Sequence, residues 1–138
     1  MPLKYFEKLK QNLHFNDNSK MLPRDHEGHD RLHKIRTLID HLIARFQTVP
    51  YETLLSVDEQ MCATKAKNYM RQYMPAKPHK WGNKLFVLSG VSGYSYNFEV
   101  YTGQENETIA TEQDLGANIV VRLLRNFPIN LNHRIYLI

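Results

Sequence analysis

The sequence contains a single cysteine and a single tryptophan among its 138 residues. The lone cysteine, Cys62, excludes an internal disulfide and is typical of proteins from a reducing compartment. No apolar run approaches the roughly 18 residues that a membrane-spanning helix needs. The first eight residues also lack the apolar centre of a secretory signal. With 42% hydrophobic and 23% charged residues, we expect a globular protein of the nucleus or cytoplasm that makes no membrane contact.

Acidic residues are missing from the whole stretch between Gln60 and Phe98. The cations of this stretch are Lys65, Lys67, Arg71, Lys77, Lys80 and Lys84. They give the stretch a charge of +6, and because the whole chain has +4, the remainder has −2. Positive charge concentrated in this way indicates a surface that contacts phosphates. The alternative is a solvated face that is merely basic.

Apolar residues recur every three or four positions at the start of the chain and predict a short amphipathic helix. They are Leu3, Phe6, Leu9 and Leu13. A turn-rich stretch follows, and the next apolar stripe predicts a helix over residues 30–47. Asp30 is the expected N-cap of this second helix, and Pro50 ends it.

After Pro50 the apolar spacing shortens towards that of strands. We expect strands at 54–58, 84–89, 94–101 and 134–138, loops at 68–79 and 102–113, and a helix from 114 to about 126. Asp114 is the expected cap of that helix, and Gly90 and Gly93 mark a hairpin turn between the second and third strands. Cys62 is expected to be a small buried residue next to the first strand.

This order predicts an α+β protein in which an N-terminal helical region precedes a partial RNase-H-like (β-β-β-α-β) mixed sheet. The last strand should lie parallel to the first. We expect the helical region to span residues 1–52 and the first half of the RNase-H-like core to span 53–138. The sequence ends within a β-like run, so this strand is either a sheet edge or part of a longer chain; we favour the longer chain.

Asp58 is the strongest candidate for chemistry, because it ends the first predicted strand and directly precedes the basic stretch. A carboxylate on a central strand beside a phosphate-binding surface is what two-metal phosphodiester chemistry requires. The alternative is that Asp58 only ends a strand. Side chains alternate along a strand, so Glu59 should face the opposite side of the sheet.

Several motifs together resemble the piggyBac family of transposases and their domesticated derivatives. They are Ser56-Val57-Asp58-Glu59-Gln60-Met61, Tyr73-Met74-Pro75, Lys77-Pro78-His79-Lys80-Trp81-Gly82 and Phe98-Glu99-Val100-Tyr101-Thr102-Gly103. Residues 13–18, 34–36 and 38–40 resemble the helical region that precedes the catalytic core of that family. The resemblance covers nearly the whole chain in order. Residues 64–67 depart from it, since they are Thr-Lys-Ala-Lys where the family more often has Phe-Lys-Gly-Arg.

The resemblance implies an RNase-H-like fold in which three aspartates bind two Mg²⁺ ions and cut and join DNA. The first aspartate matches Asp58, and the second would follow the strand at 134–138, where this sequence ends with Ile138. One carboxylate cannot hold two metal ions, so we expect no enzymatic activity and no bound Mg²⁺ for these residues alone. Glu99 is better explained as a surface or paired residue, and Asp114 as a helix cap.

The mixture of cations and aromatic residues in the basic stretch suits contact with a DNA backbone and stacking on an unpaired base. The candidate DNA-binding residues are Lys65, Lys67, Arg71, Lys77, His79, Lys80, Trp81 and Lys84. The resemblance favours weak, salt-sensitive DNA binding. The alternative is that Trp81 and the nearby tyrosines cover a sheet edge while the lysines stay solvated.

His26, His29 and His33 lie close in sequence, with Asp30 between them. Spacing alone would allow a metal site, but no catalytic glutamate and no cysteine partner accompany them, so we do not expect zinc. The sequence as a whole predicts a catalytically incomplete piggyBac-type transposase fragment that retains weak DNA binding. The alternative is a domesticated interaction module that binds a related transposase or another protein.

Overall fold

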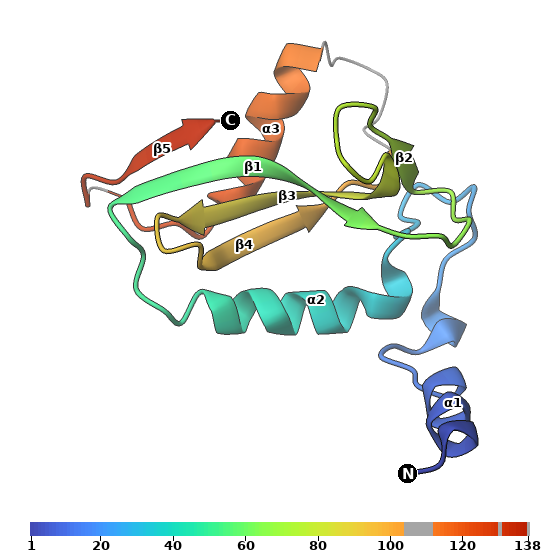
Figure 1. Ribbon diagram of the computed structural model, residues 1–138. Helices are drawn as coiled ribbons and strands as arrows, with labels where there is room; N and C mark the ends of the chain where they lie inside the picture. Colours follow the sequence, from blue (N-terminus) through green and yellow to red (C-terminus); the bar gives the residue numbers. More distant parts are fainter. Residues whose placement is uncertain (104–111, 130, 138) are drawn as a thin grey trace. The chain divides into compact units, whose positions relative to one another are not determined.

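The computed structural model describes residues 1–103, 112–129 and 131–137. Their elements follow the order α1, η1, α2, β1, β2, β3, β4, α3 and β5 (Figure 1). The chain divides into two compact units, residues 1–42 and 43–138. No helix in these described ranges has both the length and the apolarity of a transmembrane segment.

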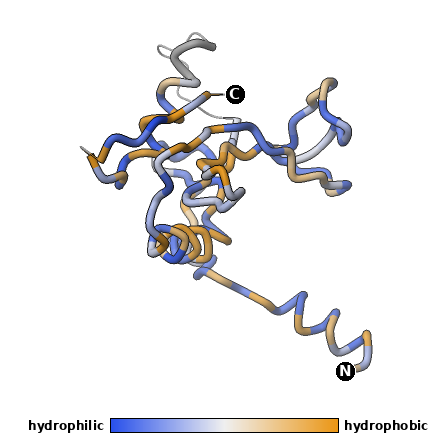
Figure 2. The backbone as a smooth tube through the Cα atoms, turned by 60° about the vertical axis from the view of Figure 1, so that its left-hand side comes forward, coloured by the Kyte–Doolittle hydropathy of each residue, from blue (hydrophilic) through white to orange (hydrophobic). Residues whose placement is uncertain are grey.

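The first unit begins with α1 (Leu3–Gln11), where a short amphipathic helix was expected. Hydrophilic and hydrophobic residues alternate along this helix (Figure 2). Its apolar residues stay in solvent: Leu3 is 69% exposed, Phe6 52% and Leu9 62%. A single 3-10 turn, η1 (Asn18–Lys20), follows and is capped by Asp17, whose side chain accepts a hydrogen bond from the Ser19 amide.

The second helix, α2 (His33–Phe46), begins three residues later than its expected start at Asp30. Asp30 still caps a turn, because its Oδ1 accepts a hydrogen bond from the Leu32 amide at 2.9 Å. Its carboxylate also accepts two hydrogen bonds from the Arg36 guanidinium, both at 2.8 Å. The predicted N-cap is therefore wrong as a helix cap, because the two residues after Asp30 form a turn that precedes the helix.

The second unit is built on a mixed sheet with β1 (Leu54–Ala63) at its centre. β3 (Trp81–Gly90) runs antiparallel to β1 over nearly its whole length. β2 (Arg71–Tyr73) and β4 (Ser95–Val100) pair with the first and second halves of β3. On the other side of β1, β5 (Arg134–Leu137) is parallel to it, with Leu55 opposite Ile135 and Val57 opposite Leu137. This parallel pairing of the last strand with the first is confirmed.

The core lies between the sheet and α3 (Glu112–Leu123). Its buried side chains come from alternate positions of β1 and β3, from β4 and from one face of the helix: Leu55, Val57, Phe86, Leu88, Tyr96, Ile119 and Leu123. Asn97 is buried beside this core and donates a hydrogen bond from Nδ2 to the Leu123 carbonyl at 2.7 Å. This contact ties β4 to the end of α3.

Strands extend further than the apolar pattern predicts. β1 continues five residues past Asp58 to Ala63, and the short β2 lies within the expected loop at 68–79. Cys62 is exposed, which corrects its expected burial. The reason is its place in β1: Cys62 pairs with Asn83, beyond the part of the ladder that covers the core.

The predicted cap at Asp114 is also wrong, because α3 begins at Glu112 and Asp114 falls within its first turn. The helix ends at Leu123 rather than at Asn126. Most of the loop expected at 102–113 lies outside the described residues, and so does Ile138 at the end of the last expected strand. Glu99 is paired, as expected, since its carboxylate accepts two hydrogen bonds from Arg122 Nε at 3.0 and 2.9 Å.

Candidate functional site

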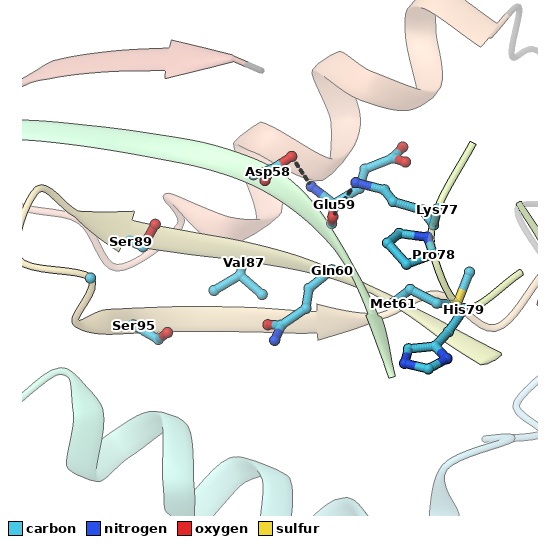
Figure 3. A pocket seen from close by; sticks show the side chains of 11 residues that line it. Asp58, Glu59, Gln60, Met61, Lys77, Pro78, His79, Val87, Ser89 and Ser95 are labelled. Atoms are coloured by element: carbon cyan, nitrogen blue, oxygen red, sulfur yellow. Dashed lines mark hydrogen bonds between the residues drawn. The ribbon is translucent and has the colours of Figure 1, made fainter. Parts of the chain in front are cut away.

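Asp58 lies on β1 at the point where three strands run side by side. It faces Val87 of β3 in the antiparallel ladder, and it directly follows Val57, which pairs with Leu137 of β5. The side chain is exposed, and its Oδ1 accepts a hydrogen bond from the Glu59 amide at 2.6 Å (Figure 3). One carboxylate oxygen thus has a fixed orientation, while the group as a whole stays accessible to solvent and to ligands.

Asp58 borders an open groove of about 470 Å³. The groove is lined by residues of β1, of the loop that follows β2, of β3 and of the β3–β4 hairpin (Figure 3). Gln60, Ser89 and Ser95 contribute polar side chains, and His79 stands at its far end in this view. Sequence reasoning missed these three polar residues; the strand alternation from Asp58 to Gln60 was the only signal for any of them.

Lys77 fastens the loop after β2 to the strand that holds Asp58. Its Nζ donates a hydrogen bond to the Glu59 carbonyl at 3.1 Å (Figure 3). The loop is closed on itself by hydrogen bonds from the Met74 amide to the Lys80 carbonyl and from the Lys77 amide to the Met74 carbonyl, at 2.8 and 3.2 Å. The loop therefore forms a fixed wall of the groove.

Glu59 directs its carboxylate away from Asp58, as strand alternation predicts. It forms an ion pair with Lys84 of β3. The Lys84 ammonium lies over two aromatic rings, 4.6 Å from the centre of Phe86 and 5.7 Å from that of Tyr101. In the part of the chain that the structure describes, Lys84 is thus the candidate DNA-binding residue that already has a carboxylate partner.

A second depression, of about 430 Å³, lies at the end of β3 that pairs with β2. Its lining includes most of the predicted DNA-binding residues: Lys65, Arg71, His79, Lys80 and Trp81. Pro78 and His79 line this depression and the Asp58 groove alike, so the two hollows adjoin. Lys67 is exposed nearby in sequence but is not part of the lining.

The three histidines near Asp30 bond to the backbone instead of converging on a metal. His29 Nδ1 lies 2.7 Å from the Leu22 carbonyl oxygen, and His33 Nε2 lies 2.9 Å from that of Asp17. The Nδ1 of His26 accepts a hydrogen bond from the Gly28 amide. Each of the three histidines thus has a backbone hydrogen-bond partner.

Within the described residues, no group of three or more histidine, cysteine or acidic side chains could hold a metal ion. Asp58 and Glu59 both line the groove, but the Glu59 carboxylate is paired with Lys84. Oxygen ligands of this kind suit Mg²⁺, but a pair of Mg²⁺ ions needs several carboxylates. The described residues therefore do not fit a complete two-metal centre.

A family model described as "Transposase IS4" matches residues 1–137. Human PiggyBac transposable element-derived protein 3 is 32% identical over 118 residues, which are 85% of this chain and 19% of that protein. Human PiggyBac transposable element-derived protein 2 is 29% identical over 120 residues, which are 86% of this chain and 19% of that protein.

A cryo-EM structure of a piggyBac transposase synaptic complex with hairpin DNA matches the fold, with a TM-score of 0.77 and 20% sequence identity. The match covers 99% of this chain and 33% of that one. The fold is thus RNase-H-like, with helices ahead of a mixed sheet, as predicted. The chain belongs to the Transposase IS4 family, with piggyBac-derived proteins among its relatives. It spans about a fifth of the length of these human relatives, 19% in both cases.

Proposed function

We propose that residues 1–138 supply a DNA-binding part of a piggyBac-type transposase core, with Asp58 as the metal-binding carboxylate of this part. The observation that supports the proposal most strongly is the place of Asp58. It is exposed next to the parallel β1–β5 pair, in a groove whose wall continues into a cationic depression. A carboxylate next to bound phosphate is the arrangement that a divalent cation can bridge.

The proposal keeps the division expected from the sequence, with a helical region up to residue 52 and the beginning of the catalytic core from residue 53. It also includes catalytic incompleteness, because Asp58 lacks the further carboxylates that two Mg²⁺ ions would need. Residues 1–138 alone should bind DNA weakly and should not cut it.

DNA binding is tested by fluorescence anisotropy with a labelled 20-base-pair duplex over a range of salt concentrations. Two of the six predicted cations already bond to Glu59, Lys77 to its carbonyl and Lys84 to its carboxylate. The four that are left for phosphate contact are Lys65, Lys67, Arg71 and Lys80. Four such contacts predict that affinity falls about 100-fold between 50 and 200 mM salt. The double variant Lys65→Gln/Lys67→Gln should lower the slope of log K against log salt by about 2.

The matched control is Lys4→Gln/Lys8→Gln, which removes the same charge from exposed positions of α1. It should leave the slope within about 0.5 of its original value. A DNA affinity that does not change with salt would contradict a phosphate-contacting surface at these residues. An equal decrease of the slope in both double variants would contradict it as well.

Catalytic incompleteness is tested by incubating residues 1–138 with supercoiled plasmid and Mg²⁺ or Mn²⁺. We expect no nicking above the level of Asp58→Ala. Metal-dependent nicking that disappears in Asp58→Ala would show that this stretch assembles an active centre by itself.

A second candidate function is an interaction module for a related transposase or another protein. The observation that favours it is the exposed apolar side of α1, formed by Leu3, Phe6 and Leu9. Exposed apolar patches of this kind often mark protein-binding surfaces. Salt-insensitive co-purification with a protein that is lost in Phe6→Glu, without any DNA retention, would favour this alternative.

A further inference from the structure

Trp81 is the sole tryptophan of the sequence, and it begins β3 with 48% of its surface exposed. The Arg71 guanidinium carbon lies 4.6 Å from the centre of the indole. The Tyr73 ring lies 4.8 Å away at an interplanar angle of 49°, and Tyr73 is itself 51% exposed. An arginine and a tyrosine therefore support an indole that still offers much of its surface to solvent.

The sheet register explains why these three side chains meet. Tyr73 of β2 pairs directly with Trp81 of β3, and Arg71 lies two residues before Tyr73 on the same strand. Residues two apart on a strand share a face, so both reach the same side as Trp81. The backbone pairing of β2 with β3 holds these three side chains together. β3 also pairs with β1, so the position of Trp81 is fixed relative to the strand that contains Asp58.

The surroundings of the indole decide between two kinds of ligand. Exposed tryptophan and tyrosine rings bind either cations or flat aromatic groups. Lys65 and Lys80 line the same depression, and no acidic residue occurs from Gln60 to Phe98. This excess of positive charge disfavours a cationic ligand and favours an anionic one that carries a flat ring, which is the chemistry of a nucleotide.

We propose that Trp81, braced by Arg71 and Tyr73, stacks on an unpaired nucleobase of the bound DNA, with Lys65 and Lys80 contacting its phosphates. This proposal rests on the proposed DNA-binding function and narrows its substrate to DNA with unpaired bases. A base inside an intact duplex has both faces stacked on its neighbours, so an indole can stack only on a base that has left the helix or never paired.

The place of the stacking surface relative to Asp58 limits which nucleotide it binds. Ala63 of β1 pairs with Gly82, next to Trp81, and lies five residues beyond Asp58. Five strand residues span about 16 Å. The stacked base therefore belongs to a nucleotide several positions away from a phosphate held at Asp58. The DNA strand between these two nucleotides passes Pro78 and His79, which line both hollows.

The experiment uses residues 1–138 with two labelled oligonucleotides at 50 mM salt: a blunt 20-base-pair duplex and the same duplex with a four-nucleotide single-stranded overhang. Trp81 fluorescence reports stacking directly, because no other tryptophan contributes to the signal. We expect the overhang DNA to quench this fluorescence and the blunt duplex to leave it unchanged. We also expect tighter binding of the overhang DNA by anisotropy.

Trp81→Ala should weaken binding of the overhang DNA about tenfold and binding of the blunt duplex less than twofold. Trp81→Phe, which keeps an aromatic ring, should restore most of the preference and guards against a folding defect in the alanine variant. The matched control is Tyr69→Ala. Tyr69 is 53% exposed in the same basic stretch but does not line the depression, so both affinities should change less than twofold.

Salt-sensitive binding of both DNAs with equal affinity and without quenching would overturn the stacking proposal and leave the proposed DNA-binding function intact. A Trp81→Phe variant as weak as Trp81→Ala on overhang DNA would overturn it as well. Absence of binding to either DNA at 50 mM salt would overturn both proposals.

Discussion

Glu59 and Lys84 form an ion pair across β1 and β3, next to the groove of Asp58. Both side chains are partly shielded, with 32% and 18% of their surfaces exposed. Because Glu59 is paired with Lys84, its carboxylate does not compete with that of Asp58 for a metal ion. The pair also takes one positive charge out of the predicted DNA-binding set.

Replacing Lys84 should therefore cost stability rather than DNA affinity. In Lys84→Met the Glu59 carboxylate stays partly buried but loses its ion-pair partner. The same substitution removes the ammonium group that lies over Phe86. We expect a loss of roughly 1–2 kcal/mol in the free energy of unfolding, between the values for exposed and buried pairs. Urea denaturation measures it. The control Lys80→Met, at an exposed position, should change stability by less than about 0.5 kcal/mol.

Asn97 should be sensitive to small changes, because its amide satisfies a carbonyl at the end of α3. Asn97→Ala leaves the Leu123 carbonyl without this donor in a buried place, which should cost about 1–3 kcal/mol. Asn97→Asp should cost more, since it puts an acceptor against an acceptor. Asn12 donates a similar hydrogen bond to the Lys8 carbonyl at an exposed position. If thermal melts show that Asn12→Ala destabilises the protein as much as Asn97→Ala, burial is not the cause of the effect.

Two glycines should respond to alanine with opposite signs. A Cβ at Gly82 would overlap the backbone carbonyl of Cys62 on the paired strand. Gly82→Ala should therefore cost about 1–3 kcal/mol. A Cβ at Gly116, within α3, meets nothing within 4 Å. Gly116→Ala should stabilise by about 0.5–1 kcal/mol, because glycine is a poor helix former. Denaturation curves that shift in the same direction for both variants would count against this explanation.

The Asp30–Arg36 pair should make the first unit sensitive to acid. The hydrogen bonds from Arg36 hold the pKa of Asp30 below its ordinary value of 3.8. A carboxyl whose pKa is lower in the folded state stabilises the fold above pH 3.8 and loses this contribution as the pH falls through the folded pKa. The effect should stay below about 1 kcal/mol, because both side chains are partly exposed.

Asp30→Asn tests this expectation, since asparagine can still accept the hydrogen bond from the Leu32 amide but has no charge. The difference in unfolding free energy between the original chain and Asp30→Asn should be constant from pH 7 to 5 and should shrink below pH 4. A difference that stays the same down to pH 2.5 would show that the charge of Asp30 does not contribute.

The spacing of apolar residues is enough to predict α1 and the centres of β1, β3 and β4. The order of the elements then predicts the parallel pairing of β5 with β1. The spacing is not enough to predict the ends of these elements. Residues 59–63 have no apolar alternation, and they join β1 because β3 offers backbone partners up to Gly82. The three residues of β2 lie among residues that favour loops, so only the pairing with β3 reveals them.

For the candidate site, the sequence predicts the residues but not their partners. Asp58 could be singled out from its strand and its basic neighbours. The ion pair of Lys84 depends on a diagonal contact between two strands whose register no sequence pattern specifies. In the same way, the support of Trp81 by Arg71 and Tyr73 depends on β2, which sequence reasoning had assigned to a loop.

The hydrogen bond from Lys77 to the Glu59 carbonyl has a consequence for the energetics of recognition. A loop that moved freely would have to be ordered before it could grip a ligand, and association would be weakened accordingly. Here Pro78 and His79 belong to a loop that is already hydrogen-bonded to the central strand through Lys77, and they line both hollows. If this part of the chain binds DNA as we propose, these two residues belong to a surface that is ordered before the ligand arrives, so little binding free energy is spent on immobilising them.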